Sequence, residues 1–259
     1  MRISPPQTHR GRAVAAFTLI EMLVVIAIIA ILMTAGSIGL SNIGGKSVTS
    51  GVTNAESLFD EARNTAVGRN LRSCVLVAKE LTNQPADDLR RIVVAYEETN
   101  KTDGTAKDPT NANPNWVISS RGLLLPDRTF FSSKFSKLDQ IADTGPINTI
   151  LASKLRDVSG GALKSSSPLY GTYYIYPFNS QGILLNPQDA NFSGASSFVI
   201  GSGSRILTKH ASAAAPRVTA SGLRDFGGFV IWHNGRTSLF HSPDQIGSGI
   251  QSLTSGATF

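Results

Sequence analysis

A single carboxylate, Glu21, lies at the start of a long apolar stretch and is the first candidate for a chemical role. Residues 17–45 read FTLIEMLVVIAIIAILMTAGSIGLSNIGG, and the 24 residues from Met22 to Gly45 carry no charge. A helix of that length spans about 36 Å, enough to cross a hydrocarbon layer of about 30 Å. Because a charge in such a layer is costly, Glu21 indicates a function and not a packing role.

The residue types that usually carry catalysis or bind metals form no recognisable constellation. The one cysteine, Cys74, excludes an intrachain disulfide, a zinc ribbon and an iron–sulfur cluster, and its apolar neighbours favour a core position. No two of the four histidines stand four residues apart, which disfavours a helical metal site. Gly44-Gly45-Lys46-Ser47 lacks the first glycine of a phosphate-binding loop, since residue 40 is leucine. We predict no enzyme, no cofactor and no metal site.

A calcium site is a weaker alternative in the polar loop 99–114. Its side-chain oxygens would come from Asp103, Asp108, Asn111 and Asn113. Loops of this composition are usually just solvated, so the sequence leaves the question open.

The charges around the apolar stretch predict its orientation in a membrane. Residues 1–16 contain three arginines and no acid, and no basic residue follows before Lys46. Basic residues stay on the cytoplasmic side, so we expect a cytoplasmic N-terminus and an exported C-terminal part. Without the first 16 residues the net charge falls from +6 to +3, so much of the basicity is a topology signal. A signal peptide cut near Thr34–Gly36 and a plain anchor are alternatives, but neither explains Glu21.

Residues 16–32, AFTLIEMLVVIAIIAIL, resemble the N-terminal signature of type IV prepilins. In that family a prepilin peptidase cuts before the phenylalanine and methylates the new amine. The resemblance implies cleavage between Ala16 and Phe17 and N-methylation of Phe17. Glu21 would then be the fifth mature residue, and its carboxylate would pair with the Phe17 amine of a neighbouring subunit and set the assembly register. Ala16 departs from the glycine usual at this position, although both are small.

The helical pattern continues beyond the apolar stretch as an amphipathic one. Six apolar residues spaced four and three apart form one stripe on a helix: Val48, Val52, Ala55, Phe59, Ala62 and Ala66. Asp60 and Arg63 lie off the stripe and are spaced to pair. We predict one helix over 17–67, ended by Gly68 or Asn70, whose second half packs on a globular domain.

The remainder is predicted to consist mostly of strands. Asn234-Gly235 is the strongest hairpin signal, and a short helix is expected around 147–155. The fold class is therefore α+β, with a long N-terminal hydrophobic helix packed on an antiparallel β-sheet head. The expected strands cover residues 72–79 and 90–97 as a hairpin, then 116–119, 123–125, 172–178, 183–185, 198–200, 206–208, 229–232 and 237–240.

These patterns divide the chain into five segments. Residues 1–16 form a leader peptide, 17–45 the membrane or filament-core half of the helix, and 46–70 its amphipathic half. Residues 71–246 form a periplasmic β-rich head, and the Gly/Ser/Thr-rich residues 247–259 form a flexible tail.

A second resemblance, to the GspH/FimT group of minor pseudopilins and minor pilins, implies a pilin-like fold. Residues 178–184, FNSQGIL, resemble that group's Phe-x-x-x-Gly turn, and residues 229–240, FVIWHNGRTSLF, resemble its last hairpin. Residues 55–78 resemble the end of its long helix through Ala62, Arg63, Ala66, Arg69 and Asn70.

Together the resemblances imply a structural minor subunit of a type II secretion pseudopilus or a type IV pilus-like filament that serves protein secretion. The expected partners are other pilin or pseudopilin subunits, the prepilin peptidase, the inner-membrane assembly platform and membrane lipid. We expect a single-pass protein of the inner membrane, with its head in the periplasm, that enters the filament on assembly.

The alternative is a displayed minor pilin that acts as a DNA-uptake receptor or an adhesin. DNA contact would rest on Lys209, Arg217, Arg224 and Arg236. Relatives called FimT use a Gly-Arg-x-Arg motif in the last hairpin, and here Gly235-Arg236-Thr237-Ser238 lacks the second arginine. The missing arginine disfavours nucleic acid as a partner.

Overall fold

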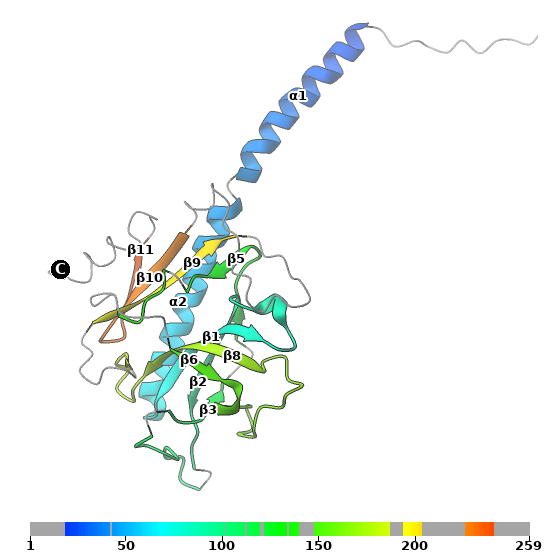
Figure 1. Ribbon diagram of the computed structural model, residues 1–259. Helices are drawn as coiled ribbons and strands as arrows, with labels where there is room; N and C mark the ends of the chain where they lie inside the picture. The colour runs from blue at the N-terminus through cyan, green and yellow to red at the C-terminus, as the bar shows by residue number, and fades with distance from the viewer. Residues whose placement is uncertain are drawn as a thin grey trace, which may run out of the picture. The chain divides into compact units, whose positions relative to one another are not determined.

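The structure, a computed structural model, describes residues 19–41, 43–100, 102–111, 113–119, 122–133, 135–139, 148–186, 194–203 and 226–240. It divides the chain into two compact units, Met1–Ile43 and Gly44–Phe259. Helix α1 (Leu19–Ser41) belongs to the first unit, and helix α2 (Ile43–Arg69) leads into the strands of the second (Figure 1). The predicted single helix is thus described as two helical segments, and Asn42 lies outside the described residues.

A helix followed by strands confirms the predicted α+β class. The short 3-10 segments are η1 (Pro85–Asp87) and η2 (Ala152–Lys154). The strands are β1 (Ser73–Leu81), β2 (Arg91–Glu97), β3 (Trp116–Ile118), β4 (Leu123–Leu124), β5 (Thr129–Phe131), β6 (Thr149–Leu151), β7 (Leu155–Arg156), β8 (Gly171–Phe178), β9 (Ala195–Ser202), β10 (Phe226–Trp232) and β11 (Thr237–Phe240).

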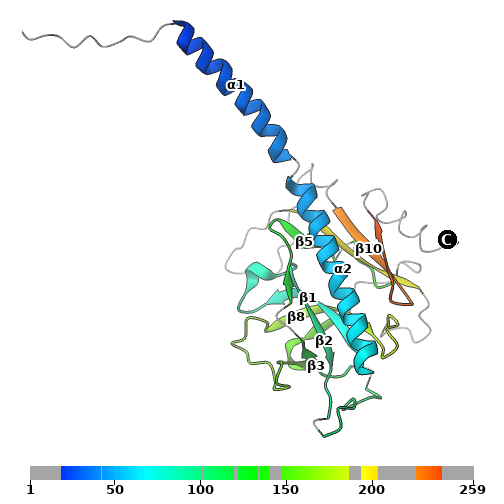
Figure 2. The same ribbon diagram turned by 180° about the vertical axis from the view of Figure 1, so that it is seen from behind.

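Helix α2 buries the apolar stripe that the spacing predicts. All six stripe residues are at most 5% exposed, whereas Asp60 and Glu61 on the other side of the helix are exposed. Figure 2 shows α2 running along the strands of the head. The stripe therefore faces the head, and the polar face of α2 forms part of the surface.

The end of α2 is set by Asn70, as predicted. Its φ of 53° lies in the left-handed region, which asparagine tolerates better than most residues. The Asn70 amide donates to the Val67 carbonyl at 3.3 Å and the Leu71 amide donates to the Ala66 carbonyl at 3.2 Å. These two bonds form a Schellman motif, and the buried Leu71 supplies its apolar contact.

The larger sheet is centred on β1. Its strands follow the order β6-β8-β1-β2-β3-β7, with β4 also paired to β2. The β1–β2 pair is antiparallel, which confirms the predicted hairpin, whereas β3 and β7 pair in parallel. Residues 73–78 are buried on both faces, because Val75 and Val77 point into one apolar cluster and Leu76 into another.

The smaller sheet has the order β11-β10-β9-β5 and is antiparallel throughout. The β10–β11 pair confirms the hairpin predicted at Asn234-Gly235, with Ile231 opposite Thr237. The head is thus built from two sheets, where the sequence predicted one antiparallel sheet.

The core lies where α2 meets both sheets, and Phe59 is at its centre. The ring of Phe59, 1% exposed, makes edge contacts at centroid distances of 5.0–6.4 Å with the rings of Tyr176, Phe178, Phe198 and Phe229. Tyr176 and Phe178 belong to the larger sheet, and Phe198 and Phe229 to the smaller. One helix residue therefore joins the two sheets through aromatic packing.

Arg72, the residue before β1, holds the polar loop between β2 and β3 against the larger sheet. The Arg72 guanidinium donates to both oxygens of the buried Glu97 carboxylate, at 2.8 and 2.5 Å. It also donates to the main-chain carbonyls of Asn111 at 2.6 Å and Asp108 at 3.1 Å. Charged and bidentate bonds of this kind are stronger than neutral ones, so this loop is tied to the sheet.

The strand expected over 183–185 is wrong, because Leu184 forms only an isolated bridge with Phe178. The helix expected around 147–155 is wrong: β6, η2 and β7 occupy that range, because Thr149 pairs with Tyr174 of β8 and Trp116 with Leu155 of β7. The strand expected over 206–208 lies outside the described residues.

Candidate functional site

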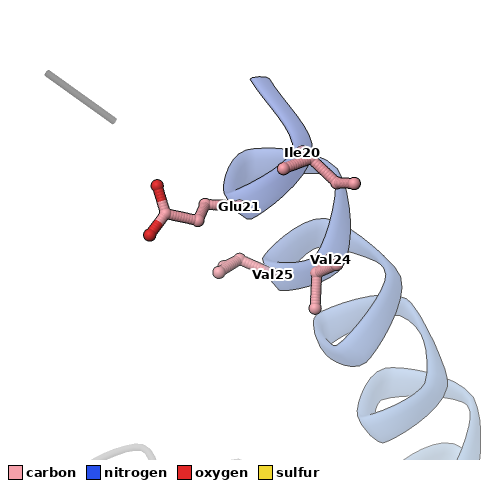
Figure 3. A pocket seen from close by; sticks show the side chains of 4 residues that line it. All are labelled: Ile20, Glu21, Val24 and Val25. Atoms are coloured by element: carbon pink, nitrogen blue, oxygen red, sulfur yellow. The ribbon is translucent and has the colours of Figure 1, made fainter. Parts of the chain in front are cut away.

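Glu21 lies in the first turn of α1, where the positive end of the helix dipole favours a carboxylate by about 0.3–1 kcal/mol. Ile20, Glu21, Val24 and Val25 line a shallow groove on the helix surface. Figure 3 shows Glu21 and Val25 projecting from the same side of α1, as residues one turn apart do. The carboxylate is therefore surrounded on its own helix by aliphatic side chains.

The rest of the described α1 surface is apolar. Nine large apolar side chains between Leu19 and Ile29 are 45–83% exposed. No helix in the described part of the chain is long and apolar enough to count as a membrane span. An apolar surface on all sides of a helix indicates a surrounding that is itself apolar.

Most of the other residues predicted for processing or for DNA contact lie outside the described part of the chain. Ala16 and Phe17 lie outside the described residues, as do Lys209, Arg217 and Arg224. Arg236 is described and lies exposed at the turn between β10 and β11. The DNA-contact prediction therefore rests, within the described residues, on Arg236.

The second unit brings together the three segments that resemble the GspH/FimT group. The turn after β8 and the turn between β10 and β11 each contain a glycine with positive φ, Gly182 at 74° and Gly235 at 75°. A methyl group added to Gly235 would lie 2.2 Å from the Gly182 carbonyl oxygen, so the two turns are in direct contact. The Leu184 amide also donates to the His233 carbonyl at 2.9 Å.

Arg63 of α2 packs into this contact between the two turns. A methyl group on Gly182 would lie 2.9 Å from Arg63 Cγ, and one on Gly235 would lie 2.9 Å from both Cδ and Nε of Arg63. Only glycine fits at both positions, since a side chain would clash and the backbone is left-handed. We call Arg63 and the turns 179–182 and 232–236 the turn junction.

The Arg63 guanidinium makes no compensating polar contact within the described residues. Nε of Arg63 is buried and has no hydrogen-bond partner there. The Asp60–Arg63 pair that the sequence predicts is wrong, because no ion pair joins these two described residues. A buried donor without an acceptor costs about 1–3 kcal/mol, so the fold bears a cost at this residue.

Sequence reasoning did not identify the turn junction as a site. The available signal was that the Ala62-Arg63 segment and both glycine turns resembled one family, but no local rule places them together. A hydrogen bond also joins the last hairpin to α2: the Thr237 hydroxyl of β11 donates to Glu56 Oε1 of α2 at 2.6 Å.

Titratable residues elsewhere in the head are engaged in structure. Cys74 is fully buried in β1, as predicted, and burial raises the pKa of its thiol well above the usual value. Burial disfavours the charged form of Glu98, but hydrogen bonds from Asn115 and Lys107 outweigh burial and lower the pKa of this carboxyl. The described residues contain no group of three or more His, Cys, Asp or Glu side chains that could hold a metal ion.

Two of the four side chains proposed for calcium, those of Asp103 and Asn111, accept hydrogen bonds within the loop. Asp103 accepts from the amide and the hydroxyl of Thr105, which lowers the pKa of its carboxyl, and Asn111 accepts from the Asn113 amide. The main-chain carbonyls of Asp108 and Asn111 accept from Arg72.

Comparison with known proteins bears on the N-terminal segment. The type IV minor pilin FimU of Pseudomonas aeruginosa is similar in two crystal forms, at 10% and 11% identity over 78% and 76% of this chain and 92% and 95% of that chain. The TM-scores are 0.35 and 0.33, too low to support an argument. No curated protein matches the chain significantly. Residues 11–37 match the family model described as the prokaryotic N-terminal methylation motif. At its N-terminus this chain is therefore prepilin-like.

Proposed function

We propose that this chain is a minor structural subunit of a type IV pilus-like filament or a type II secretion pseudopilus, and not an enzyme. The observation that carries the proposal is α1 itself, an exposed apolar helix with one carboxylate in its first turn. The helix lies largely within the residues that match the methylation motif. A prepilin peptidase cuts between Ala16 and Phe17 and methylates the new amine.

Before assembly, the apolar helix anchors the protein in the inner membrane. The 24 uncharged residues from Met22 to Gly45 are long enough for a hydrocarbon core of about 30 Å. The basic leader holds the N-terminus in the cytoplasm, and the head lies in the periplasm. Membrane lipid covers the apolar surface of α1 at this stage.

On assembly, helices of neighbouring pilin or pseudopilin subunits replace the lipid around α1. The Glu21 carboxylate pairs with the Phe17 amine of a neighbour, since each of these charges is costly alone in an apolar layer. A subunit in the wrong register leaves both charges unpaired, so the pair fixes the position of each helix in the filament. The inner-membrane assembly platform is the further partner that this process requires.

Intact-mass measurement of the protein purified from its native membrane tests the processing step. The expected mass is that of a chain beginning at N-methylated Phe17. Retention of the first 16 residues would contradict the proposal, and so would a chain that begins near Gly36, as an ordinary secreted protein would.

Glu21→Ala tests the register step. The variant inserts into the membrane normally, because it removes a charge from the apolar stretch. It leaves the amine of the neighbour unpaired, at a cost of about 3–5 kcal/mol, so its amount in sheared filaments falls at least about tenfold. Val25→Ala, on the same side of α1, is the matched control. Equal incorporation of both variants would contradict the proposed role of Glu21 in setting the register.

A further inference from the structure

Among the residues that the structure describes, Arg63 is held in position by the backbone of two turns and not by a charge of opposite sign. The Gly182 and Gly235 turns contact its Cγ, Cδ and Nε atoms. The side chain as a whole is half-buried while Nε is buried, so its exposed part lies toward the tip of the guanidinium. An arginine whose rotamer is already fixed loses little conformational entropy when a partner binds its tip.

Two guanidinium groups at the turn junction are without an acceptor inside the described part of the protein. Neither Arg63 nor the exposed Arg236, which follows Gly235, takes part in an ion pair or a side-chain hydrogen bond there. By contrast, Arg72, Arg90, Arg91 and Arg156 of the head all have acidic partners. Within the part of the chain that the structure describes, neither guanidinium of the turn junction is bound by a carboxylate.

We propose that the turn junction is a contact surface for another subunit, whose carboxylate side chain binds the tip of Arg63. The proposal rests on the proposed function, because the partner is a neighbour in the filament. The planar guanidinium can donate two parallel hydrogen bonds to one carboxylate, a geometry that other side-chain acceptors do not match. Val67, 54% exposed and in contact with Gly182, adds apolar surface beside the charge.

A protein carboxylate suits this surface better than a nucleic acid does. Three acidic residues, Glu56, Asp60 and Glu61, lie on the same helix within seven residues of Arg63, and the last two are exposed. An extended polyanion would meet these carboxylates, whereas a single carboxylate reaches the tip of Arg63 alone. Nucleic-acid binding is therefore the competing outcome that the test has to separate.

The first test measures incorporation of Arg63→Met into sheared filaments. Methionine keeps an unbranched apolar stem against the two glycines and removes the buried unpaired Nε, so the full chain in detergent micelles unfolds at an unchanged or higher temperature. We expect incorporation to fall about tenfold or more, and Arg63→Lys to fall between Met and the native residue. Arg128→Met, at an exposed arginine that has no ion pair in the described residues, is the control.

Incorporation of Arg63→Met at the native level would overturn the proposal. If the unaltered chain itself is absent from filaments, the proposed function fails, and the turn junction is then tested by the second experiment alone.

The second test uses the native sequence, so it does not depend on the folding of a variant. The side-chain resonances of the ¹⁵N-arginine-labelled full chain in micelles are followed during titration with acetate, and separately with a short DNA duplex, at constant ionic strength. A saturable shift of the Arg63 resonance with acetate but not with chloride supports the carboxylate site. No such shift, or a stronger response of Arg63 to the duplex than to acetate, overturns it.

Discussion

Helices α1 and α2 follow each other in the chain, yet they use apolar residues in opposite ways. Apart from Glu21, the described side chains of α1 are apolar and exposed, whereas α2 has one apolar stripe that is almost fully buried. The comparison shows that the spacing of apolar residues, more than their number, indicates where a partner lies. An apolar stripe needs cover on one side of a helix, whereas a helix that is apolar all round needs apolar surroundings on every side.

The stability of the head should therefore depend on α2 and hardly at all on α1. Three substitutions test this difference, and each is measured as the free energy of unfolding of the full chain in micelles, followed by a probe of the head such as tryptophan fluorescence.

Phe59→Ala has the largest expected effect. It removes a ring that contacts four other aromatic rings and leaves a cavity between the two sheets. The expected loss is about 3–5 kcal/mol, and insertion into the membrane is unchanged. Asn64→Ala, at an exposed position of the same helix, should stay within about 0.5 kcal/mol. Similar losses for both variants would show that the stripe is not the main support of the head.

Gly235→Ala should cause the second largest loss of stability, because it adds both backbone strain and steric overlap. The φ of 75° costs an alanine about 1–2 kcal/mol, and the new methyl group would overlap the Gly182 carbonyl and the Arg63 stem, at about 1–3 kcal/mol more. Gly104→Ala is a matched control, with a φ of 70° and no atom within 4 Å of the added methyl group. The difference between the two variants measures the packing at the turn junction, and equal losses would argue against it.

Ile26→Ala on α1 has the smallest expected effect on the head. The side chain is 63% exposed, so its truncation should change the free energy of unfolding by no more than about 0.5 kcal/mol. A loss above about 1.5 kcal/mol would show that α1 is packed against its own chain, and the contrast between the two helices would fail.

Local patterns predicted much of this fold. The stripe of α2, its end at Asn70, the β1–β2 hairpin and the turn at Asn234-Gly235 all depend on residues close in sequence, where helix and turn rules apply. The prediction that Glu21 has a functional role also comes from local sequence, since one charge in an apolar stretch is visible without any tertiary contact.

Features that depend on distant segments were missed. The two-sheet arrangement joins β5 to β9 and β3 to β7, and no local signal gives those pairs. The Asp60–Arg63 prediction was wrong because a helical spacing rule ignores the turn at 232–236, about 170 residues farther along the chain, that covers the Arg63 stem. The turn junction could be seen only once these three segments were placed together.

The attachment of the loop between β2 and β3 to Arg72 does not depend on which side chains stand at positions 108 and 111. Arg72 holds this loop through the main-chain oxygens of Asp108 and Asn111, and those atoms are the same whatever residue stands at either position. A change of side chain at Asp108 or Asn111 therefore leaves the bonds from Arg72 in place, provided that Arg72 and Glu97 are kept. The side chain of Asp108 can thus change, and so alter what this surface meets, without rebuilding the sheet beneath.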